Sequence, residues 1–201
     1  MTSRTKLLVI AFFLVTAIFL VYSPALHYGF IGLDDDELVV RNPDIKILNL
    51  DRIGHLVKRH YITLYIPVTM LSYAMDYQIW HLTPFGFRFS NILLHFLNAV
   101  LVFYLIQLIQ KNFAIALGVS LIFALHPVQI ESVIWISERK NVLSAFFLLL
   151  CVISYWKATL FGPAQERKRL FITLGLFLLG LLSKPSTVIF LLIVFLMNHF
   201  L

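Results

Sequence analysis

The chain has 201 residues, of which 60% are hydrophobic and only 13% are charged, with a formal net charge of +6. A soluble domain of this length cannot hide so much apolar surface, so the composition indicates an integral membrane protein. The basic residues stand mostly at the ends of apolar runs, where they face lipid headgroups, so the positive charge does not indicate a nucleic-acid partner.

Six apolar segments predict an all-α, polytopic membrane protein. A helix needs about 20 apolar residues to cross the hydrocarbon core, and fewer where the bilayer thins. The stretch Ser23-Pro24-Ala25 loosely resembles a cleavage site, so a signal peptide remains an alternative for the first segment. The predicted spans are 7–23, 89–108, 113–126, 142–160, 170–183 and 187–201.

The distribution of Lys and Arg predicts a cytoplasmic N-terminus. Basic residues are dense in the short segments 1–6, 110–112 and 157–169, and sparse along the loop 24–87. In this topology Glu166 is the one acidic residue on the cytoplasmic side. The acidic run after the first span, the stretch 126–140 and Lys184 then share the external face.

The external loop 24–87 is too long and too mixed in composition for a simple connector. Residues 43–60 have amphipathic character, which is typical of a helix lying along the membrane interface. Residues 61–80 are apolar, rich in aromatic residues and broken by Pro67, and we expect a half-buried or interfacial helix pair there. A further span is the alternative for this segment.

Four consecutive acidic residues, Asp34 to Glu37, lie just beyond the first predicted span. In a chain that is mostly lipid-soluble, such a run indicates the mouth of a membrane-embedded active site. A solvated patch of loop charge is the alternative interpretation.

Two predicted spans end where a polar residue precedes proline, at His126-Pro127 and at Lys184-Pro185. Proline ends or kinks a helix, and irregular backbone at membrane depth persists only when it is buried in protein or lines a wet cavity. These two breaks therefore predict a cavity on one side of the membrane.

The stretch after His126 is the second polar run of interest. If 126–141 were one helix, Glu131, Trp135, Glu138 and Arg139 would form a single polar and aromatic stripe. The alternative is an interfacial helix end with local ion pairs and an aromatic anchor. The chain has no His or Cys spacing typical of a zinc site and no G-x-S-x-G or P-loop pattern.

Taken in order, these motifs resemble those of one family. They include Gly29-Phe30 with Leu33-Asp34-Asp35, Asn42, Asp44, Tyr65-Ile66-Pro67, Leu71-Ser72-Tyr73, Asp76, Pro84, Asn91, His95, Asn98-Ala99, Ala124-Leu125-His126-Pro127, Glu131-Ser132-Val133, Trp135, Glu138-Arg139-Lys140, Leu143-Ser144 and Leu182-Ser183-Lys184-Pro185. The pattern is similar to the membrane half of the transmembrane and tetratricopeptide-repeat proteins, glycosyltransferases of the GT-C class. Family members often carry histidine where this chain has Ile66 and Arg88.

The resemblance implies a GT-C-like helical bundle and an inverting transfer of a sugar, often mannose. The implied donor is a polyprenyl-phosphate sugar, and the acceptor is a hydroxyl of a protein or glycan on the external face of the bacterial inner membrane or the lumenal face of the endoplasmic reticulum. It further implies C-terminal tetratricopeptide repeats, and no 34-residue repeat occurs in this sequence, so we expect an N-terminal fragment.

The resemblance also implies roles for particular residues. Asp34 and Asp35 match the family's acidic pair, and either is expected to be the base or, with a divalent metal, its ligand. No other cofactor is expected. The expected phosphate contacts are Arg139, Lys140 and Lys184, and the expected pocket residues are His126, Glu131, Trp135 and Glu138. A transporter and a non-catalytic membrane anchor for a repeat domain remain alternatives.

Overall fold

The computed structural model describes residues 3–160 and 163–200, and in this part of the chain it contains helices and no β-strand beyond an isolated bridge between Tyr61 and Leu64. The all-α prediction is therefore confirmed. Residues 1–2, 161–162 and 201, which belong to predicted cytoplasmic segments and to the last predicted span, lie outside the described residues.

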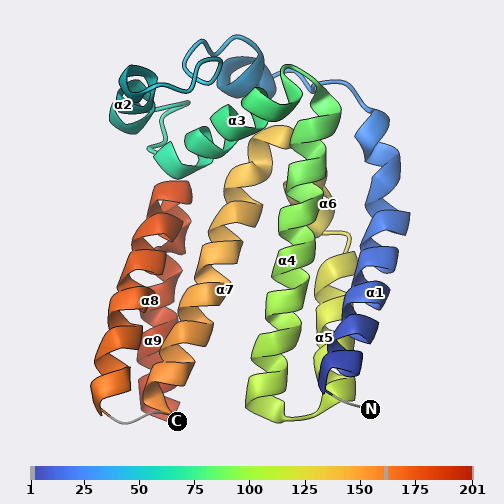
Figure 1. Cartoon of the computed structure of the whole chain (residues 1–201), viewed down its shortest axis with the longest axis vertical. Coiled ribbons are helices and arrows are strands. Elements are labelled where there is room, and N and C mark those ends of the chain that lie inside the picture. The colour runs from blue at the N-terminus through green and yellow to red at the C-terminus, as the bar shows by residue number, and fades with distance from the viewer. Residues whose placement is uncertain (1–2, 161–162, 201) are drawn as a thin grey trace.

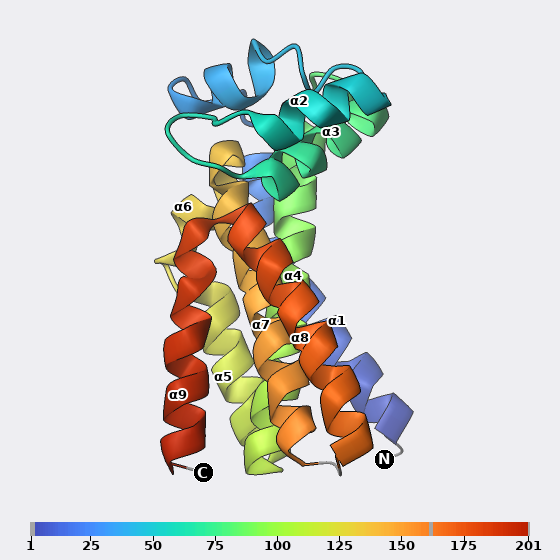
Figure 2. The ribbon, with the colours of Figure 1, turned by 90° about the vertical axis from the view of Figure 1, so that its left-hand side faces the viewer.

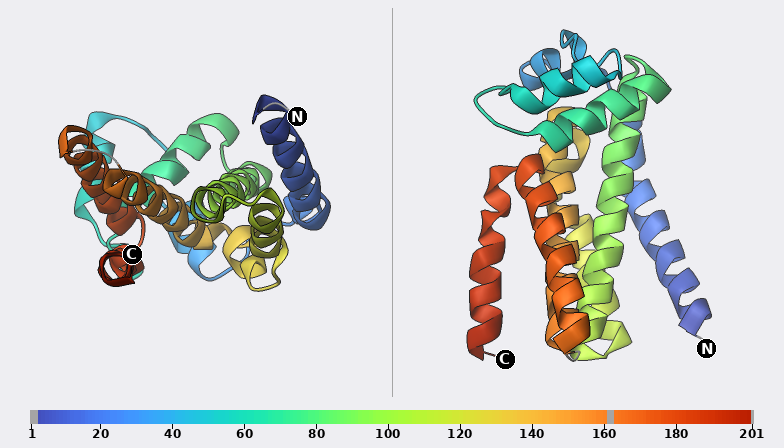
Figure 3. Two further views of the ribbon diagram at one scale, coloured as in Figure 1. Left: turned by 90° about the horizontal axis from the view of Figure 1, so that it is seen from below. Right: turned by 60° about the vertical axis from the view of Figure 1, so that its left-hand side comes forward.

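The long helices run side by side along one axis, and both chain ends lie at the same end of the bundle (Figure 1). Residues 23–83 cap the opposite end, where α2 and α3 lie across the bundle (Figures 1 and 2). Seen from below, α1 stands at one end of an elongated row, and α8 and α9 stand at the other (Figure 3). The helices are α1 (Ser3–Tyr22), α2 (Leu50–Lys58), α3 (Pro67–Trp80), α4 (Pro84–Gln110), α5 (Phe113–Leu125), α6 (Gln129–Ile134), α7 (Arg139–Thr159), α8 (Pro163–Ser183) and α9 (Ile189–Phe200), with the shorter helical turns η1 (Ser23–His27), η2 (Asp36–Val40), η3 (Ile136–Glu138) and η4 (Pro185–Val188).

Helix α1 packs into the bundle through one stripe. Ile10, Leu14, Ile18 and Tyr22 recur every four residues and are buried in a core shared with α4 and α5. The Tyr22 hydroxyl donates a hydrogen bond to the Ala124 carbonyl at 3.2 Å. These contacts make α1 a structural member of the bundle.

The outward faces of the bundle are apolar. Phe12 and Leu20 on α1 and Phe171 on α8 are 68%, 72% and 73% exposed. In water, contiguous exposed apolar surface of this kind is unfavourable, and it is typical of contact with lipid or with further protein.

Length and hydropathy mark two of the described helical segments as able to cross a membrane, Pro84–Gln110 and Ile136–Thr159, with mean hydropathies of 2.3 and 1.7. The segments Phe12–His27, Phe113–Leu125 and Pro185–His199 are apolar and shorter. The six-span topology therefore stays a prediction.

Several helix ends differ from those expected. Helix α4 begins at Pro84 and α7 at Arg139, whereas the predicted spans begin at residues 89 and 142. The helices start earlier because Arg88, Arg139 and Lys140 are buried and find partners inside the protein. A charged residue therefore does not mark the helix end at these positions.

The cap also differs from its prediction. The expected helix pair over 61–80 is wrong, because only α3 is helical and residues 61–64 form a tight turn closed by two backbone hydrogen bonds. The predicted amphipathic segment 43–60 contains one short helix, α2. Ile45 and Leu56 in this segment are buried in the core of the cap, so it packs onto protein.

Candidate active site

The acidic run follows a strained turn at the capped end of the bundle. Leu33 has a φ of 67°, in the left-handed region that bulky residues rarely adopt. Asp34 and Asp35 come next and lead into η2, Asp36–Val40. Backbone strain of this kind costs on the order of 1–3 kcal/mol and concentrates at functional sites, so the turn is a candidate site.

Asp35 is fully buried and its carboxylate is held by hydrogen bonds. One oxygen accepts from the backbone N–H of Ile31 at 3.0 Å. The other accepts from the backbone N–H of Ser137 at 2.9 Å and from the Ser137 hydroxyl. Asp35 therefore joins the acidic turn to the break between α6 and α7.

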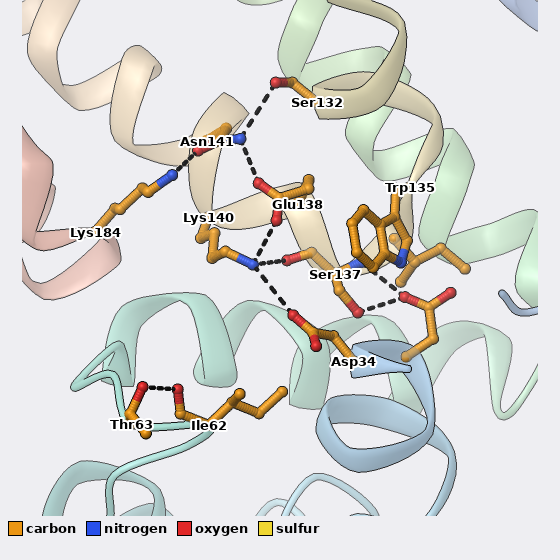
Figure 4. A network of polar contacts seen from close by, with 12 residues as sticks. Asp34, Ile62, Thr63, Ser132, Trp135, Ser137, Glu138, Lys140, Asn141 and Lys184 are labelled. Carbon is orange, nitrogen blue, oxygen red and sulfur yellow. Dashed lines mark hydrogen bonds and ion pairs between the residues drawn. The ribbon is translucent and has the colours of Figure 1, made fainter. Parts of the chain in front are cut away.

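Asp34 is the more accessible of the pair, with its side chain 32% exposed, and it begins a polar network (Figure 4). Its carboxylate lies 3.7 Å from the Lys140 ammonium, which is 2.7 Å from Glu138 and donates to the Ser137 carbonyl at 3.1 Å. A half-exposed carboxylate beside a buried lysine can accept a proton from a bound hydroxyl group.

The network continues to Lys184 at the start of η4 (Figure 4). The Asn141 amide donates hydrogen bonds to Glu138 and, at 3.2 Å, to the Ser132 hydroxyl. Its oxygen accepts a hydrogen bond from the Lys184 ammonium. The structure thus brings together the three stretches that were expected to share one face: the acidic turn, the residues after His126, and Lys184.

Arg139 lies apart from this network. Its guanidinium is 1% exposed and forms an ion pair with Asp76 at 2.6 Å. It also donates to Asn91 at 2.7 Å and to the Phe87 carbonyl at 2.7 Å, and it sits 4.7 Å above the Tyr73 ring. The expected phosphate contact conflicts with this burial, and the ion-pair partner is neither Glu131 nor Glu138. Arg139 joins α3, α4 and α7.

The prediction of one continuous helix over 126–141, with a single polar and aromatic stripe, is wrong. The backbone leaves the helix at Trp135, with φ and ψ of −74° and 119°, so that α6, η3 and α7 are separate elements. Glu131 is exposed, whereas Glu138 is mostly buried in the network. The break lets Ser137 offer its N–H to Asp35, which a continuous helix would not allow.

The remaining expected pocket residues lie outside the network. His126 is exposed and is the C-cap residue of α5, and its Nδ1 accepts a hydrogen bond from the Val128 N–H just before α6. The Trp135 indole N–H is buried without a hydrogen-bond partner in the described structure, and the Trp135 carbonyl accepts from Asn91 at 3.3 Å.

Sequence reasoning missed Ser137 and Asn141, which connect the acidic turn to the lysines. A signal for Asn141 was present, because Glu138-Arg139-Lys140-Asn141 is an uninterrupted polar run opening a long apolar helix. The sequence pointed to Arg88 only as a position where family members often carry histidine. It is buried and donates to the Tyr28, Gly29 and Ile134 carbonyls, which fixes the chain leading into the acidic turn.

The described residues contain no group of three or more His, Cys, Asp or Glu side chains arranged to hold a metal ion. Asp34 and Asp35 have different partners, Lys140 for one and Ser137 with Ile31 for the other. No third His, Cys, Asp or Glu side chain therefore joins the expected two-carboxylate metal site in the described residues.

A second acidic residue organises the cap beside the turn. Asp44 is 1% exposed and accepts hydrogen bonds from Arg59 at 2.8 Å, Tyr61 at 3.2 Å and Arg52 at 3.2 Å. Burial alone would raise the pKa of Asp44, but these hydrogen bonds and the charge of Arg59 outweigh it and lower the pKa. An open pocket of about 430 Å³ lies between this cluster and η2.

The comparisons with known proteins agree on one family. The chain is 32% identical over 120 residues to Protein O-mannosyl-transferase TMTC1 of Mus musculus, a match that covers 57% of this chain and 13% of that protein. It is 28% identical over 178 residues to Protein O-mannosyl-transferase Tmtc1 of Drosophila melanogaster, covering 85% of this chain and 20% of that protein. The chain is 30% identical over 146 residues to Protein O-mannosyl-transferase TMTC1 of Homo sapiens, covering 68% of this chain and 16% of that protein.

The chain therefore spans a fifth or less of the length of these three relatives. No protein-family model matches it, and no solved structure does. The resemblance read from the motifs is nevertheless confirmed, because relatives from mammals, fly and worm are all named as protein O-mannosyl-transferases. The chain is a homologue of part of the transmembrane and tetratricopeptide-repeat O-mannosyl-transferases.

Proposed function

We propose that this chain forms the catalytic end of a membrane protein O-mannosyltransferase of the GT-C class. In this proposal it transfers mannose from a polyprenyl-phosphate donor to a protein hydroxyl at the external or lumenal face. The observation that carries the proposal is the network from Asp34 through Lys140, Glu138 and Asn141 to Lys184. It places an accessible carboxylate and two lysines at one end of an apolar helical bundle.

The chemistry follows from these groups. Asp34 accepts the proton of the acceptor hydroxyl as its oxygen attacks the anomeric carbon of the sugar. The bond from that carbon to the phosphate oxygen breaks, and its electron pair leaves with the lipid phosphate. Lys184 and Lys140 stabilise the negative charge that develops there. A single displacement inverts the anomeric carbon.

The structure distinguishes the two aspartates in this scheme. The carboxylate of Asp35 is fully buried and accepts hydrogen bonds from Ile31 and Ser137, so an acceptor hydroxyl would have to displace protein donors to reach it. Asp34 is exposed on one side and contacts a lysine. We assign the base to Asp34 and a positioning role to Asp35.

Arg139 is left out of the donor site in this proposal, because its guanidinium is occupied by Asp76, Asn91 and Phe87. Of the three cations expected to bind phosphate, Lys184 is the one whose described partner is a neutral amide. A phosphate can therefore approach Lys184 without competing with a paired carboxylate.

The test is mannosyl transfer by the full-length protein, reconstituted with a polyprenyl-phosphate mannose donor. Asp34→Asn should lower the transfer rate by about 100-fold or more, since general-base catalysis contributes that much. Asp36→Asn is the matched control, because Asp36 lies two residues further along the same acidic run and pairs with the exposed Arg41. Unchanged turnover in Asp34→Asn would overturn the assignment and favour the anchor interpretation.

A second measurement isolates the phosphate contact. Lys184→Met should raise the donor KM, whereas Lys184→Arg should retain most of the affinity because the positive charge stays. Equal donor KM values for wild type and Lys184→Met would remove Lys184 from the donor site.

The proposal also fixes an orientation, with the N-terminus cytoplasmic and the cap of residues 23–83 external. Helix α2 is largely solvent-exposed, and Leu50 at its start is 89% exposed. A cysteine placed at position 50 should react with a membrane-impermeant thiol reagent from the external or lumenal side. Reaction only from the cytoplasmic side would contradict the orientation.

A further inference from the structure

A polar stripe runs along the inner face of α4, an otherwise apolar helix. Asn91, His95 and Asn98 are each no more than 1% exposed. Asn91 donates to the Trp135 carbonyl at 3.3 Å, His95 Nε2 lies 2.9 Å from the Ala124 carbonyl, and Asn98 donates to the Val142 carbonyl at 2.8 Å. Each residue thus bonds a neighbouring segment through one nitrogen, and the Asn91 oxygen also accepts a hydrogen bond from Arg139.

Two atoms of this stripe remain without a hydrogen-bond partner in the described structure, Nδ1 of His95 and Oδ1 of Asn98. A carbonyl oxygen can only accept, so the neutral His95 ring carries its proton on Nε2 and presents a lone pair at Nδ1. Both unpartnered atoms are therefore acceptors. A buried acceptor without a donor is unfavourable, which predicts that a ligand or water supplies donors here.

His95 and Asn98 line the same pocket of about 190 Å³, between α4, α5, α6 and α7. Their two unpartnered atoms are themselves buried, so a ligand reaches them only after the lining side chains shift. One water needs only about 15 Å³ of such space, so there is room for more than a single water. The lining residues are His95, Asn98, Phe123, Gln129, Ser132, Asn141, Val142 and Ala145.

The chemistry of the lining selects the ligand. A phosphate oxygen would meet the lone pairs of His95 and Asn98 and be repelled, whereas a hydroxyl group can donate to both. The Phe123 ring lies 5.4 Å from the His95 ring and adds an apolar wall that suits the C–H face of a sugar. Asn141 and Ser132 line the pocket and also belong to the network, so the pocket adjoins the proposed catalytic groups.

We propose that this pocket holds the sugar ring of the lipid-linked donor, with two sugar hydroxyls donating to His95 Nδ1 and Asn98 Oδ1. The inference rests on the proposed function and names the residues that recognise the sugar. The phosphate stays outside the pocket, beside Lys184. Lys184 donates a hydrogen bond to Asn141, which lines the pocket.

The test compares two ligands on the full-length protein in lipid nanodiscs, polyprenyl-phosphate mannose and polyprenyl phosphate without sugar. Wild type should bind the mannosylated lipid about thirtyfold more tightly, the value expected from two hydrogen bonds of ordinary net strength. His95→Phe and Asn98→Leu should reduce this preference towards equal binding, and binding of the sugar-free lipid should stay unchanged.

Two further variants separate recognition from folding. Ala145→Leu fills the pocket from α7 without removing a polar group, and it should also abolish the preference. Tyr22→Phe is the matched control, because Tyr22 donates to the same Ala124 carbonyl as His95 and does not line the pocket. It should keep the wild-type preference.

The outcomes distinguish this inference from the proposed function. Equal binding of the two lipids by wild type, or an unchanged preference in Asn98→Leu and Ala145→Leu, would overturn the sugar pocket. Asp34→Asn should lose transfer and keep the preference. If it kept both, the catalytic proposal would fail and the pocket would stand as a site for lipid-linked sugar.

Discussion

The ion pair between Arg139 and Asp76 gives the sharpest test of how the cap is attached to the bundle. The two side chains are 1% and 11% exposed and approach to 2.6 Å, which joins α3 to the first residue of α7. Asp76→Asn removes the negative charge and leaves the guanidinium buried. Removing one partner of a buried pair costs about 3–5 kcal/mol, because the remaining charge has lost its compensation.

The lower end of this range applies here. Arg139 keeps its hydrogen bonds to Asn91 and Phe87 and its contact with the Tyr73 ring. We therefore expect a loss of about 3 kcal/mol, which changes the folding equilibrium roughly a hundredfold. The assay is unfolding of the purified protein in mixed micelles under increasing denaturant, followed by tryptophan fluorescence.

The control is the same substitution in an exposed pair. Asp36 is 42% exposed and contacts Arg41 at 3.1 Å, so screening by solvent should keep the effect of Asp36→Asn below about 1 kcal/mol. If Asp76→Asn destabilised the protein no more than Asp36→Asn, the pair would not anchor the cap, and Arg139 would return to consideration as a ligand-binding cation.

Three further outcomes follow from the structure. Asp35→Asn should lower the unfolding midpoint in thermal scans more than Asp34→Asn, because Asp35 loses charge-assisted hydrogen bonds worth about 1.5–3 kcal/mol each and Asp34 is partly solvated. Gly86→Ala should destabilise the corner between α3 and α4 by about 1–3 kcal/mol in the same scans, since its Cβ would lie 2.1 Å from the Trp80 side chain. The lowered pKa of Asp44 stabilises the cap above the unfolded pKa of about 3.9, and this stability is lost as pH falls through the folded pKa. Limited proteolysis should therefore cleave Asp44→Asn faster than wild type at pH 7, with the difference shrinking once the pH falls below about 3.9 and through the lowered folded pKa.

Apolar runs and proline breaks predicted the helices well, because they depend on local composition. Helices α5 and α8 end directly before His126 and Lys184, as the polar-proline breaks indicated. The starts of α4 and α7 could not be placed in this way. Arg88 and Arg139 look like residues at membrane boundaries, and only tertiary contacts show that they are buried within helices.

The candidate site was predictable as a set of segments and not as a set of contacts. The acidic turn, the residues after His126 and Lys184 do meet at one end of the bundle. Which of Asp34 and Asp35 is accessible depends on the break at Trp135, which frees the Ser137 N–H for Asp35. A helix drawn through that break gives a regular stripe and places Glu131 and Glu138 on one face.

The charged residues at this end of the bundle divide by the partners that bury them. Arg88 and Arg139 are satisfied by backbone carbonyls, an amide and one aspartate, and these groups come from the helices and turns that build the site. A ligand phosphate could reach either guanidinium only by breaking that framework. Lys184 contacts one neutral amide, so binding an anion there costs a single hydrogen bond. The difference in cost argues that the two arginines hold the surrounding helices and turns together and that Lys184 meets the substrate phosphate.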